Sequence, residues 1–378
     1  MMSLKLKNMK IALCLFKYFP YGGLQRDFLR IAQELVNRGH DVRVYTESWQ
    51  GDKPQEKMDI VLVPVSAMTN HGCNEQYHRW VFQHLSSHPV DRVVGFNRMP
   101  GLDVYFGADT CYAEKVQKEK NFFYKLTSRY KHYASYEKQT VGKGLKTKLM
   151  IITPTQKVEY QKHYQTEEKR FYLLPPGIAR DRHYSNFSQA DRFVFRQQLS
   201  IEDDQLVMLQ IGSDFKRKGV DRSITALASL PEKVRSKVVF LVVGQDNETK
   251  YQEVANKLGV KQQVRFLGGR DDVAQLIAAA DLFVHPARSE AAGEAILEAM
   301  VGGLPQIVTK VCGYAHYVDE AQSGVLLADP FDQNEFNRCL LHALDWNQLS
   351  EWRQRARLFA DQEDLYSLPR KAADIILG

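Results

Sequence analysis

Short apolar runs alternate with amphipathic segments along the chain, and this alternation predicts strands and helices in turn. The first apolar run, residues 11–16, is followed by a loop and by residues 24–38, whose apolar side chains recur at helical spacing. Gly39 and His40 end this predicted helix before a second apolar run at residues 42–46. A strand, a helix and a strand in this order predict the opening of a parallel, doubly wound sheet.

The same alternation continues through two halves of the chain. The first half adds predicted strands at residues 60–63, 92–96 and 150–153. The second half predicts a helix at residues 220–230 and strands at residues 207–211, 238–243, 264–267, 282–285, 306–309 and 325–327. The fold class is therefore α/β, with two Rossmann-like domains and an intervening cleft.

The boundary between the domains is predicted where the turn-forming residues gather. Pro175, Pro176 and Gly177 follow an apolar strand, so residues 173–178 are the expected hinge. We place the first domain at residues 1–175 and the second at residues 176–357. Ligands of such sheets bind at the carboxyl ends of the strands, so both domains should present loops to the cleft.

Length and composition support this organisation and exclude several protein classes. The 378 residues exceed what one hydrophobic core organises, and 44% hydrophobic with 25% charged residues is typical of a soluble globular protein. No apolar run has the length of a membrane span or of a signal peptide, so we expect a cytoplasmic protein. The five cysteines form no CxxC pair, which indicates reduced thiols rather than disulfides or a zinc site.

Two glutamates eight positions apart form the most informative motif, in residues 289–300. Glu290 lies in the loop after a predicted strand, and Glu298 lies more than a turn into a helix that starts near Gly293. A carboxylate accepts two hydroxyl hydrogen bonds, so such a pair suits a ligand with hydroxyl groups at both ends. The backbone N–H groups of Gly293, Glu294 and Ala295 offer a site for a phosphate oxygen. The spacing alone also fits two glutamates at an ordinary helix start.

A basic loop accompanies these glutamates. Residues 212–219 follow a strand and open a helix, which places Arg217 and Lys218 at the carboxyl end of the sheet. A diphosphate leaving group requires positive charge there, and arginine can hold it with two parallel hydrogen bonds. Alternatively, Arg217 and Lys218 are two solvated residues on a surface loop that bind no diphosphate. Arg182 and Arg270, each just beyond a strand, are further candidates for donor binding.

The paired glutamates resemble the motif of retaining GT-B glycosyltransferases, and the resemblance extends over nearly the whole chain. Residues 17–27, 95–103, 312–317 and 364–369 are similar to lipopolysaccharide core glucosyltransferases of that family. The resemblance implies a GT-B fold whose C-terminal helix, residues 358–378, packs back on the first domain. It also implies retaining transfer of glucose from UDP-glucose to an inner-core heptose, at the cytoplasmic face of the inner membrane.

The resemblance assigns roles to individual residues. Glu290 would hold sugar hydroxyls and Glu298 the ribose, while Arg217 and Lys218 would neutralise the diphosphate in place of a metal ion. No Asp-X-Asp motif, on which metal-dependent glycosyltransferases rely, occurs in the sequence.

The first domain contributes two expected donor contacts. Gly23 would let that domain approach the donor, and Asp27 would support this contact. Glu294 departs from the family pattern, because we expect an apolar residue beside the phosphate-binding N–H groups.

Residues 112–138 interleave lysines and arginines with aromatic residues. Basic residues are attracted to an anionic leaflet and aromatic residues suit the headgroup boundary, so we expect this segment to dock on the membrane that carries the acceptor. A solvated helix with partly buried aromatics is the alternative, and no nucleic-acid-binding module accompanies the segment.

Asp109, just before residues 112–138, is a candidate for holding the acceptor hydroxyl. Lys17, Arg26, His71 and Arg98 are unranked candidates for contacts with a phosphorylated heptose.

Other functions on the same scaffold stay open at this point. The chain can use another UDP-hexose or acceptor, or act as a UDP-sugar epimerase, because a fold does not fix a function. Paired carboxylates also occur in glycosidases, although the basic diphosphate loop argues against that class. A non-catalytic membrane scaffold would lack donor binding.

Overall fold

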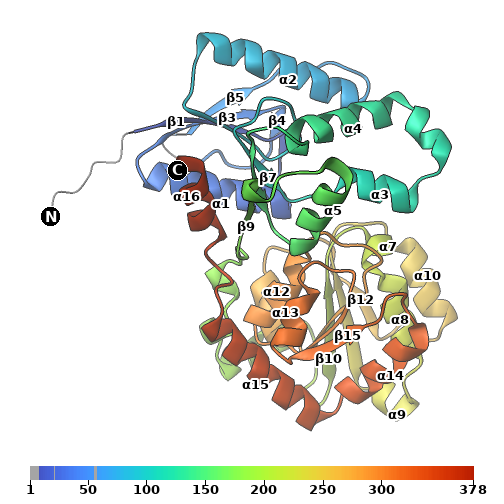
Figure 1. Ribbon diagram of the computed structural model, residues 1–378. Helices are drawn as coiled ribbons and strands as arrows, with labels where there is room; N and C mark the ends of the chain where they lie inside the picture. Colours follow the sequence, from blue (N-terminus) through green and yellow to red (C-terminus); the bar gives the residue numbers. More distant parts are fainter. Residues whose placement is uncertain (1–7, 21, 55–57) are drawn as a thin grey trace. The chain divides into compact units, whose positions relative to one another are not determined.

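The computed structural model describes residues 8–20, 22–54 and 58–378. The chain forms two compact units (Figure 1). The first contains Met1–Gly177 and Ser367–Gly378, and the second contains Ile178–Tyr366. The division after Gly177 falls within the segment in which the sequence predicts a hinge, two residues beyond the domain boundary that we placed there.

The first unit is built on a parallel sheet of seven strands in the order β5-β3-β1-β6-β7-β8-β9. The strands are β1 Lys10–Cys14, β3 Asp41–Thr46, β5 Met58–Leu62, β6 Arg92–Gly95, β7 Val104–Gly107, β8 Lys148–Ile151 and β9 Phe171–Leu173. From β1 the chain first builds outward through β3 and β5 and then returns to add β6 on the other side. The loops after β1 and β6 therefore diverge at the carboxyl edge, which creates the crevice where such sheets bind ligands.

The helices of the first unit connect these strands. They are α1 Gly23–Asn37, α2 Asn70–Ser87, α3 Tyr112–Glu119, α4 Ser128–Val141 and α5 Pro154–Tyr164, with 3-10 helices at Phe122–Leu126 and Glu168–Arg170. A separate pair of short parallel strands, β2 Lys17–Tyr18 and β4 Ser48–Trp49, joins the loops that follow β1 and β3. The rings of Tyr18 and Trp49 stack with centroids 3.8 Å apart, so this small sheet fixes both loops.

The C-terminal helix α16, Leu368–Leu377, packs against α1 in the first unit (Figure 1). Arg38 donates to Asp374 at 2.6 Å and to the carbonyl oxygen of Arg370 at 3.1 Å. The sequence predicted one helix over residues 358–378, whereas the structure has two. Helix α15, Trp346–Gln362, belongs to the second unit, because its buried face packs against α12, Glu294–Val301. Residues 363–367 separate them, and Pro369 lies in the first turn of α16, where proline is tolerated.

The second unit has a parallel sheet of six strands in the order β12-β11-β10-β13-β14-β15. The strands are β10 Leu206–Ile211, β11 Val238–Val243, β12 Val264–Phe266, β13 Leu282–His285, β14 Gln306–Thr309 and β15 Gly324–Leu327. All residues of β10, β11, β13 and β14 are buried, as expected for strands covered on both faces. The order reverses between β10 and β13, so the ligand-binding crevice of this unit is expected beyond these two strands.

The helices of the second unit complete its layers. Besides α12 and α15 they are α6 Gln189–Gln198, α7 Phe215–Lys218, α8 Val220–Ala228, α9 Glu232–Arg235, α10 Thr249–Lys257, α11 Val273–Ala279, α13 Ala315–Glu320 and α14 Gln333–Ala343, with 3-10 helices at Arg180–Arg182 and Tyr184–Asn186. The strands predicted at residues 238–243, 282–285 and 306–309 match β11, β13 and β14, and the other predicted strands differ by one or two residues at their ends. The sequence did not predict β7, which consists of four buried residues with no alternation of polar and apolar positions.

Asp281 anchors the amino end of β13 although its side chain is buried. Its carboxylate accepts the backbone N–H of Val207 at 2.9 Å and pairs with Arg192 at 2.6 Å and Arg196 at 3.2 Å. Arg353 lies 3.6 Å away. The carboxylate therefore ties β10 and β13 to helices α6 and α15, and three guanidinium groups depend on its charge.

We expect Asp281→Asn to destabilise the second unit by about 3–5 kcal/mol, because removing one partner of a buried ion pair leaves the remaining charges uncompensated. Urea unfolding followed by circular dichroism measures the change. Asp203→Asn, which removes an exposed carboxylate close in sequence to β10, is the matched control and should change the stability little. A loss below 1 kcal/mol in Asp281→Asn would contradict this anchoring role.

Candidate functional site

The crevice of the second unit begins with the loop after β10. Gly212 has φ +139° and Asp214 has φ 62°, so the chain turns sharply into the short helix α7. The Asp214 side chain caps this helix by accepting the backbone N–H of Arg217 at 3.2 Å. Asparagine and aspartate tolerate the left-handed conformation and make good caps, which explains why the sequence turns here. The result places Arg217 and Lys218 directly beyond β10.

The loop after β13 brings Glu290 to the same point. Arg217 Nη1 donates to Glu290 Oε2 at 2.7 Å, and Lys218 Nζ donates to the same oxygen. Glu290 and Lys218 are largely buried, whereas Arg217 is partly exposed. Burial opposes ionisation of Glu290, but the nearby His285 and the charges of Lys218 and Arg217 hold its pKa well below the usual range. The three residues that the sequence singled out as central therefore form one ion cluster.

Contacts between the two loops keep this cluster in place. A Cβ atom on Gly219 would collide with the carbonyl oxygen of Pro286, so the loops approach more closely than another residue would allow. The backbone N–H of Arg288 donates to the Arg217 carbonyl oxygen at 2.7 Å. The Arg288 guanidinium group holds Asp221 with two hydrogen bonds of 2.8 and 2.7 Å.

Sequence reasoning missed Arg288 and Asp221. Their partnership joins residues 67 positions apart, so neither residue stands out without the fold. It also missed Gln210, whose buried amide nitrogen donates to the Lys218 carbonyl oxygen at 2.7 Å from within β10. A glutamine in an otherwise apolar strand was the available signal, because buried polar groups are normally hydrogen-bonded.

His285, the last residue of β13, lies beneath the cluster with its side chain fully buried. Its Nε2 atom is 3.7 Å from Glu290 Oε2, beyond ordinary hydrogen-bond length. Burial lowers the pKa of His285 to about 4, and the nearby Lys218 charge acts in the same direction. A neutral imidazole therefore lines the floor of the site at neutral pH. The sequence analysis gave this histidine no role.

Glu298 is buried on α12, and its Oε1 atom lies 3.9 Å from Arg182 Nε. The structure therefore brings together Glu298 and Arg182, two predicted donor-site residues from distant parts of the second unit. Arg270 is held differently, since it forms two hydrogen bonds of 2.8 and 2.5 Å with Asp272. The partner of Arg270 in the structure is thus a neighbouring carboxylate in its own loop.

The amino end of α12 has the geometry that the sequence predicted. Gly293 is the N-cap with φ +93°, and it provides no side chain to cap the first turn. Glu294 and Ala295 are the first two helical residues. An acidic residue in the first turn is favourable because it faces the positive end of the helix dipole, which gives a physical reason for the departure at Glu294.

In the first unit, Gly23 begins α1 and Asp27 is buried one turn later. A Cβ atom added to Gly177 would lie 3.3 Å from Asp27 Oδ1 and 2.9 Å from the Cβ of Leu368. Asp27 therefore lies beside Gly177, the last residue before the chain enters the second unit, and near Leu368, just after the chain returns.

A cavity of about 350 Å³ opens at the carboxyl ends of the strands of the first unit. Its lining includes Asp109, the predicted acceptor-site residue, which follows β7 and is exposed. Asp109 does not cap α3, whose N-cap is Cys111. Of the four basic residues left unranked by the sequence, Lys17 and Arg98 line this cavity.

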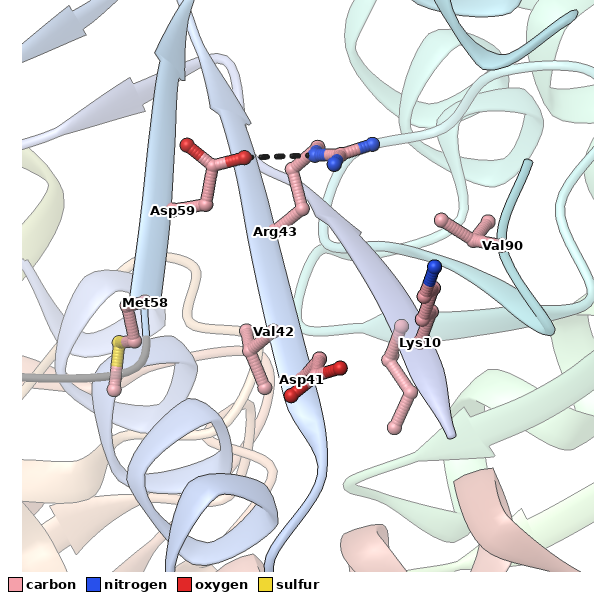
Figure 2. A pocket seen from close by; sticks show the side chains of 8 residues that line it. Lys10, Asp41, Val42, Arg43, Met58, Asp59 and Val90 are labelled. Carbon is pink, nitrogen blue, oxygen red and sulfur yellow. Dashed lines mark hydrogen bonds and ion pairs between the residues drawn. The ribbon is translucent and has the colours of Figure 1, made fainter. Parts of the chain in front are cut away.

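A second cavity, of about 430 Å³, lies at the opposite edge of the same sheet. Figure 2 shows its lining, in which Arg43 donates to Asp59 at 2.8 Å across neighbouring strands. Lys10, Asp41 and Met58 also line it, and each is the first residue of its strand. Because ligands of parallel sheets bind at the carboxyl ends, we do not assign the site to this cavity.

The basic and aromatic segment, residues 112–138, comprises α3, a 3-10 helix and the first part of α4. Phe122 and Phe123 are 72% and 73% exposed, and Leu126 beside them is exposed as well. Tyr136 is buried, whereas Tyr112, Tyr124, Tyr130 and Tyr133 form a partly buried cluster. The aromatics thus divide into a packed base and an exposed apolar tip.

The described residues include neither a cluster of metal-ligating side chains nor a membrane-spanning helix. Within residues 8–20, 22–54 and 58–378, no group of three or more His, Cys, Asp or Glu side chains is arranged to hold a metal ion. No helix in that part of the chain is long and apolar enough to cross a bilayer. All five cysteines are free thiols.

Comparison with known proteins places this geometry in context. Residues 191–359 match the family of glycosyl transferases group 1. The chain is 56% identical over 371 residues to the lipopolysaccharide glucosyltransferase WaaG of Escherichia coli K12, covering 98% of this chain and 99% of that one. A crystal structure of WaaG superposes with a TM-score of 0.94 and 56% identity, over 97% and 100% of the two chains. These matches confirm the GT-B fold class.

A more distant structure shares the fold. Anabaena Alr3699/HepE in complex with UDP-glucose has a TM-score of 0.76 and 20% identity, over 97% of this chain and 99% of its own.

Glu290→Gln should tighten the binding of pyrophosphate at least tenfold, or by about 1.4 kcal/mol. The substitution keeps the side-chain shape but removes the internal anion that occupies Arg217 and Lys218. Isothermal titration calorimetry at constant ionic strength measures the change. Asp214→Asn is the matched control, because Asp214 pairs with the exposed side of Arg217 and should matter far less. Weaker or unchanged binding in Glu290→Gln would show that Glu290 does not compete for these cations.

Proposed function

The chain belongs to the WaaG family of lipopolysaccharide glycosyltransferases, and we propose that it transfers glucose from UDP-glucose to an inner-core heptose with retention of configuration. The observation that supports this most directly is the cluster of Arg217, Lys218 and Glu290 at the carboxyl edge of β10 and β13. It combines two cations, which suit a diphosphate, with one carboxylate, which suits sugar hydroxyls.

The donor would bind by exchanging partners within this cluster. Arg217 offers a planar guanidinium group that can hold two phosphate oxygens at once, and Lys218 adds a compact charge deeper in the site. As the diphosphate takes these cations, the carboxylate of Glu290 is released to accept hydroxyl hydrogen bonds from glucose. Charge-assisted hydrogen bonds of this kind contribute about 1.5–3 kcal/mol each, which is enough to orient the sugar.

The nucleoside end of the donor would lie toward α12. Glu298 is buried on that helix, and its carboxylate suits the two ribose hydroxyls. The first-turn N–H groups that follow Gly293 carry the positive end of the helix dipole and suit a phosphate oxygen. Arg182 would orient the Glu298 carboxylate from the side.

Departure of UDP leaves negative charge on the diphosphate, and the enzyme must stabilise it in the transition state. Arg217 and Lys218 would supply this stabilisation, so we propose that transfer requires no metal ion. The acceptor hydroxyl would be held by Asp109, which follows β7 in the first unit.

The acceptor is anchored in a membrane, and residues 112–138 are proposed to bring the enzyme to its cytoplasmic surface. Phe122, Phe123 and Leu126 form an exposed apolar tip, and Lys120 and Lys125, which flank it, are exposed as well. Apolar side chains can enter the headgroup boundary while lysines contact anionic lipids, each contributing about 1 kcal/mol. The enzyme would then be a peripheral protein of the inner membrane.

The first experiment is a donor comparison with truncated lipopolysaccharide ending in heptose, in the presence of a chelator. We expect transfer from UDP-glucose, with UDP-galactose and UDP-N-acetylglucosamine at least tenfold slower in kcat/KM. Glu290→Ala should reduce transfer at least a hundredfold and keep the circular dichroism spectrum. Preference for another donor would overturn the assignment of glucose, and a requirement for added metal would overturn the role of Arg217 and Lys218. Release of UDP without any acceptor would favour the epimerase.

Neutralising Lys118, Lys120, Lys125 and Lys131 together to glutamine should lower partitioning onto anionic vesicles at least tenfold. Partitioning onto neutral vesicles should change little. The matched control neutralises four exposed lysines of the second unit, Lys233, Lys250, Lys257 and Lys261, and so changes the net charge equally. Equal losses in both variants would mean that binding depends on net charge alone and not on residues 112–138.

A further inference from the structure

The cavity at the carboxyl edge of the first unit has a lining that the proposed function does not yet use. It lies beyond β1 and β6, where the strand order of this sheet reverses, and loops after β3 and β7 close it. Ligand cavities usually have volumes of about 300–1,000 Å³. At about 350 Å³, this cavity has room for one sugar residue but not for a long oligosaccharide.

Two charged residues of the lining, Lys17 and Glu47, lie on loops that are joined to each other. Lys17 belongs to β2, and Glu47 immediately precedes β4, its partner strand. The backbone N–H of Glu47 donates to the Phe16 carbonyl oxygen at 2.8 Å, so the loops after β1 and β3 are joined at this point. Glu47 Oε2 lies 3.7 Å from Lys17 Nζ. The glutamate side chain is 5% exposed, whereas that of Lys17 is 60% exposed.

The positive charges of this lining are already balanced. Arg98 Nε lies 3.1 Å from the fully buried carboxylate of Glu137, and Arg98 Nη2 donates to the Thr110 carbonyl oxygen at 2.5 Å. Lys17 faces Glu47, and Asp109 adds a further negative charge. Within the described part of the lining, each cation therefore has a carboxylate partner. In the second unit, by comparison, Arg217 and Lys218 share the carboxylate of Glu290, and Arg217 also pairs with the exposed Asp214.

The remaining polar groups suit hydroxyls. Burial raises the pKa of the Glu47 carboxyl group, and the nearby charge of Lys17 offsets part of this rise. A raised pKa is expected for a carboxylate with few hydrogen bonds. Asn97 uses its Oδ1 atom to accept the backbone N–H of Phe16 at 2.8 Å, which leaves its amide nitrogen as a donor. Asn74 and Tyr133 also line the cavity. Amides, carboxylates and an aromatic side chain together suit a neutral polyol.

We propose that this cavity binds an unphosphorylated sugar of the acceptor, with Glu47 accepting its hydroxyl hydrogen bonds, and that a phosphate group on this sugar prevents binding. The inference rests on the proposed transfer to a lipopolysaccharide acceptor. It follows from the charges, since a phosphate group here would face Glu47 and Asp109 without an unpaired cation in the described lining to oppose them. Like charges brought together in a partly buried site oppose binding strongly.

The experiment compares truncated lipopolysaccharide whose heptoses carry no phosphate with the same molecule phosphorylated on its heptoses. Wild-type enzyme should favour the unphosphorylated acceptor at least twentyfold in kcat/KM. Glu47→Gln should raise KM for that acceptor about tenfold and reduce the preference, because the cavity loses one negative charge. Lys17→Met should increase the preference, because the cavity loses one positive charge. The KM for UDP-glucose should change less than twofold in both variants.

Glu75→Gln, at an exposed position of α2 in the same unit, is the matched control and should leave all these constants unchanged. Lys17 is exposed, so Lys17→Met still tests the proposal if Glu47→Gln does not fold. Equal use of both acceptors, or a preference that neither variant shifts, would overturn the proposal.

Calorimetric binding of each acceptor without donor separates this proposal from the proposed function. Selective binding of the unphosphorylated acceptor by an enzyme that transfers no sugar would support the cavity and refute the transfer reaction. Transfer of glucose, together with acceptor binding that Glu47→Gln does not change, would support the transfer reaction and refute the role of the cavity.

Discussion

The candidate active site depends on one buried carboxylate and its two cations. Removing a single charge from water is strongly unfavourable, so the buried Glu290 requires Arg217 and Lys218, and the buried Lys218 requires Glu290. This mutual dependence links the loop after β10 to the loop after β13. The contacts of Gly219, Arg288 and Asp221 then follow from it, because two loops can share a buried ion cluster only if their backbones approach closely.

The strand order explains why each unit has its polar groups where it does. In both sheets the chain builds outward from one central strand and then continues on its other side, between β1 and β6 in one and between β10 and β13 in the other. At that position no connection crosses the carboxyl edge, so loops can diverge and leave space. The fold thus supplies two similar crevices, and their chemistry differs only through side chains. In one crevice Arg217 and Lys218 share the buried carboxylate of Glu290, and in the other Lys17 and Arg98 each have a carboxylate of their own.

The sequence predicted the elements of the fold, and it singled out Glu290, Arg217 and Lys218 as candidate site residues, because both depend on local patterns. Glu290, Glu298, Arg217 and Lys218 lie at fixed distances from strand ends, and apolar runs mark the strands. What it could not predict depends on pairs far apart in the chain. Neither the partnership of Arg288 with Asp221 nor the pairing of Lys17 with Glu47 has a local signature.

The C-terminal boundary shows the same limit. Both α15 and α16 have helical patterns, and only packing decides that α15 belongs to the second unit and α16 to the first.

The charge count of the ion cluster gives a physical reason for combining two cations with one carboxylate. Without donor, Arg217 and Lys218 share the buried carboxylate of Glu290, and the one further carboxylate that pairs with Arg217 in the described structure, Asp214, is exposed to solvent. A nucleotide sugar brings one negative charge on each phosphate, and these would satisfy both cations. Glu290 would then be left charged beside a diphosphate, where only neutral hydrogen-bond donors can approach it favourably. Sugar hydroxyls are such donors. The charges that bind the diphosphate therefore also favour a sugar next to it.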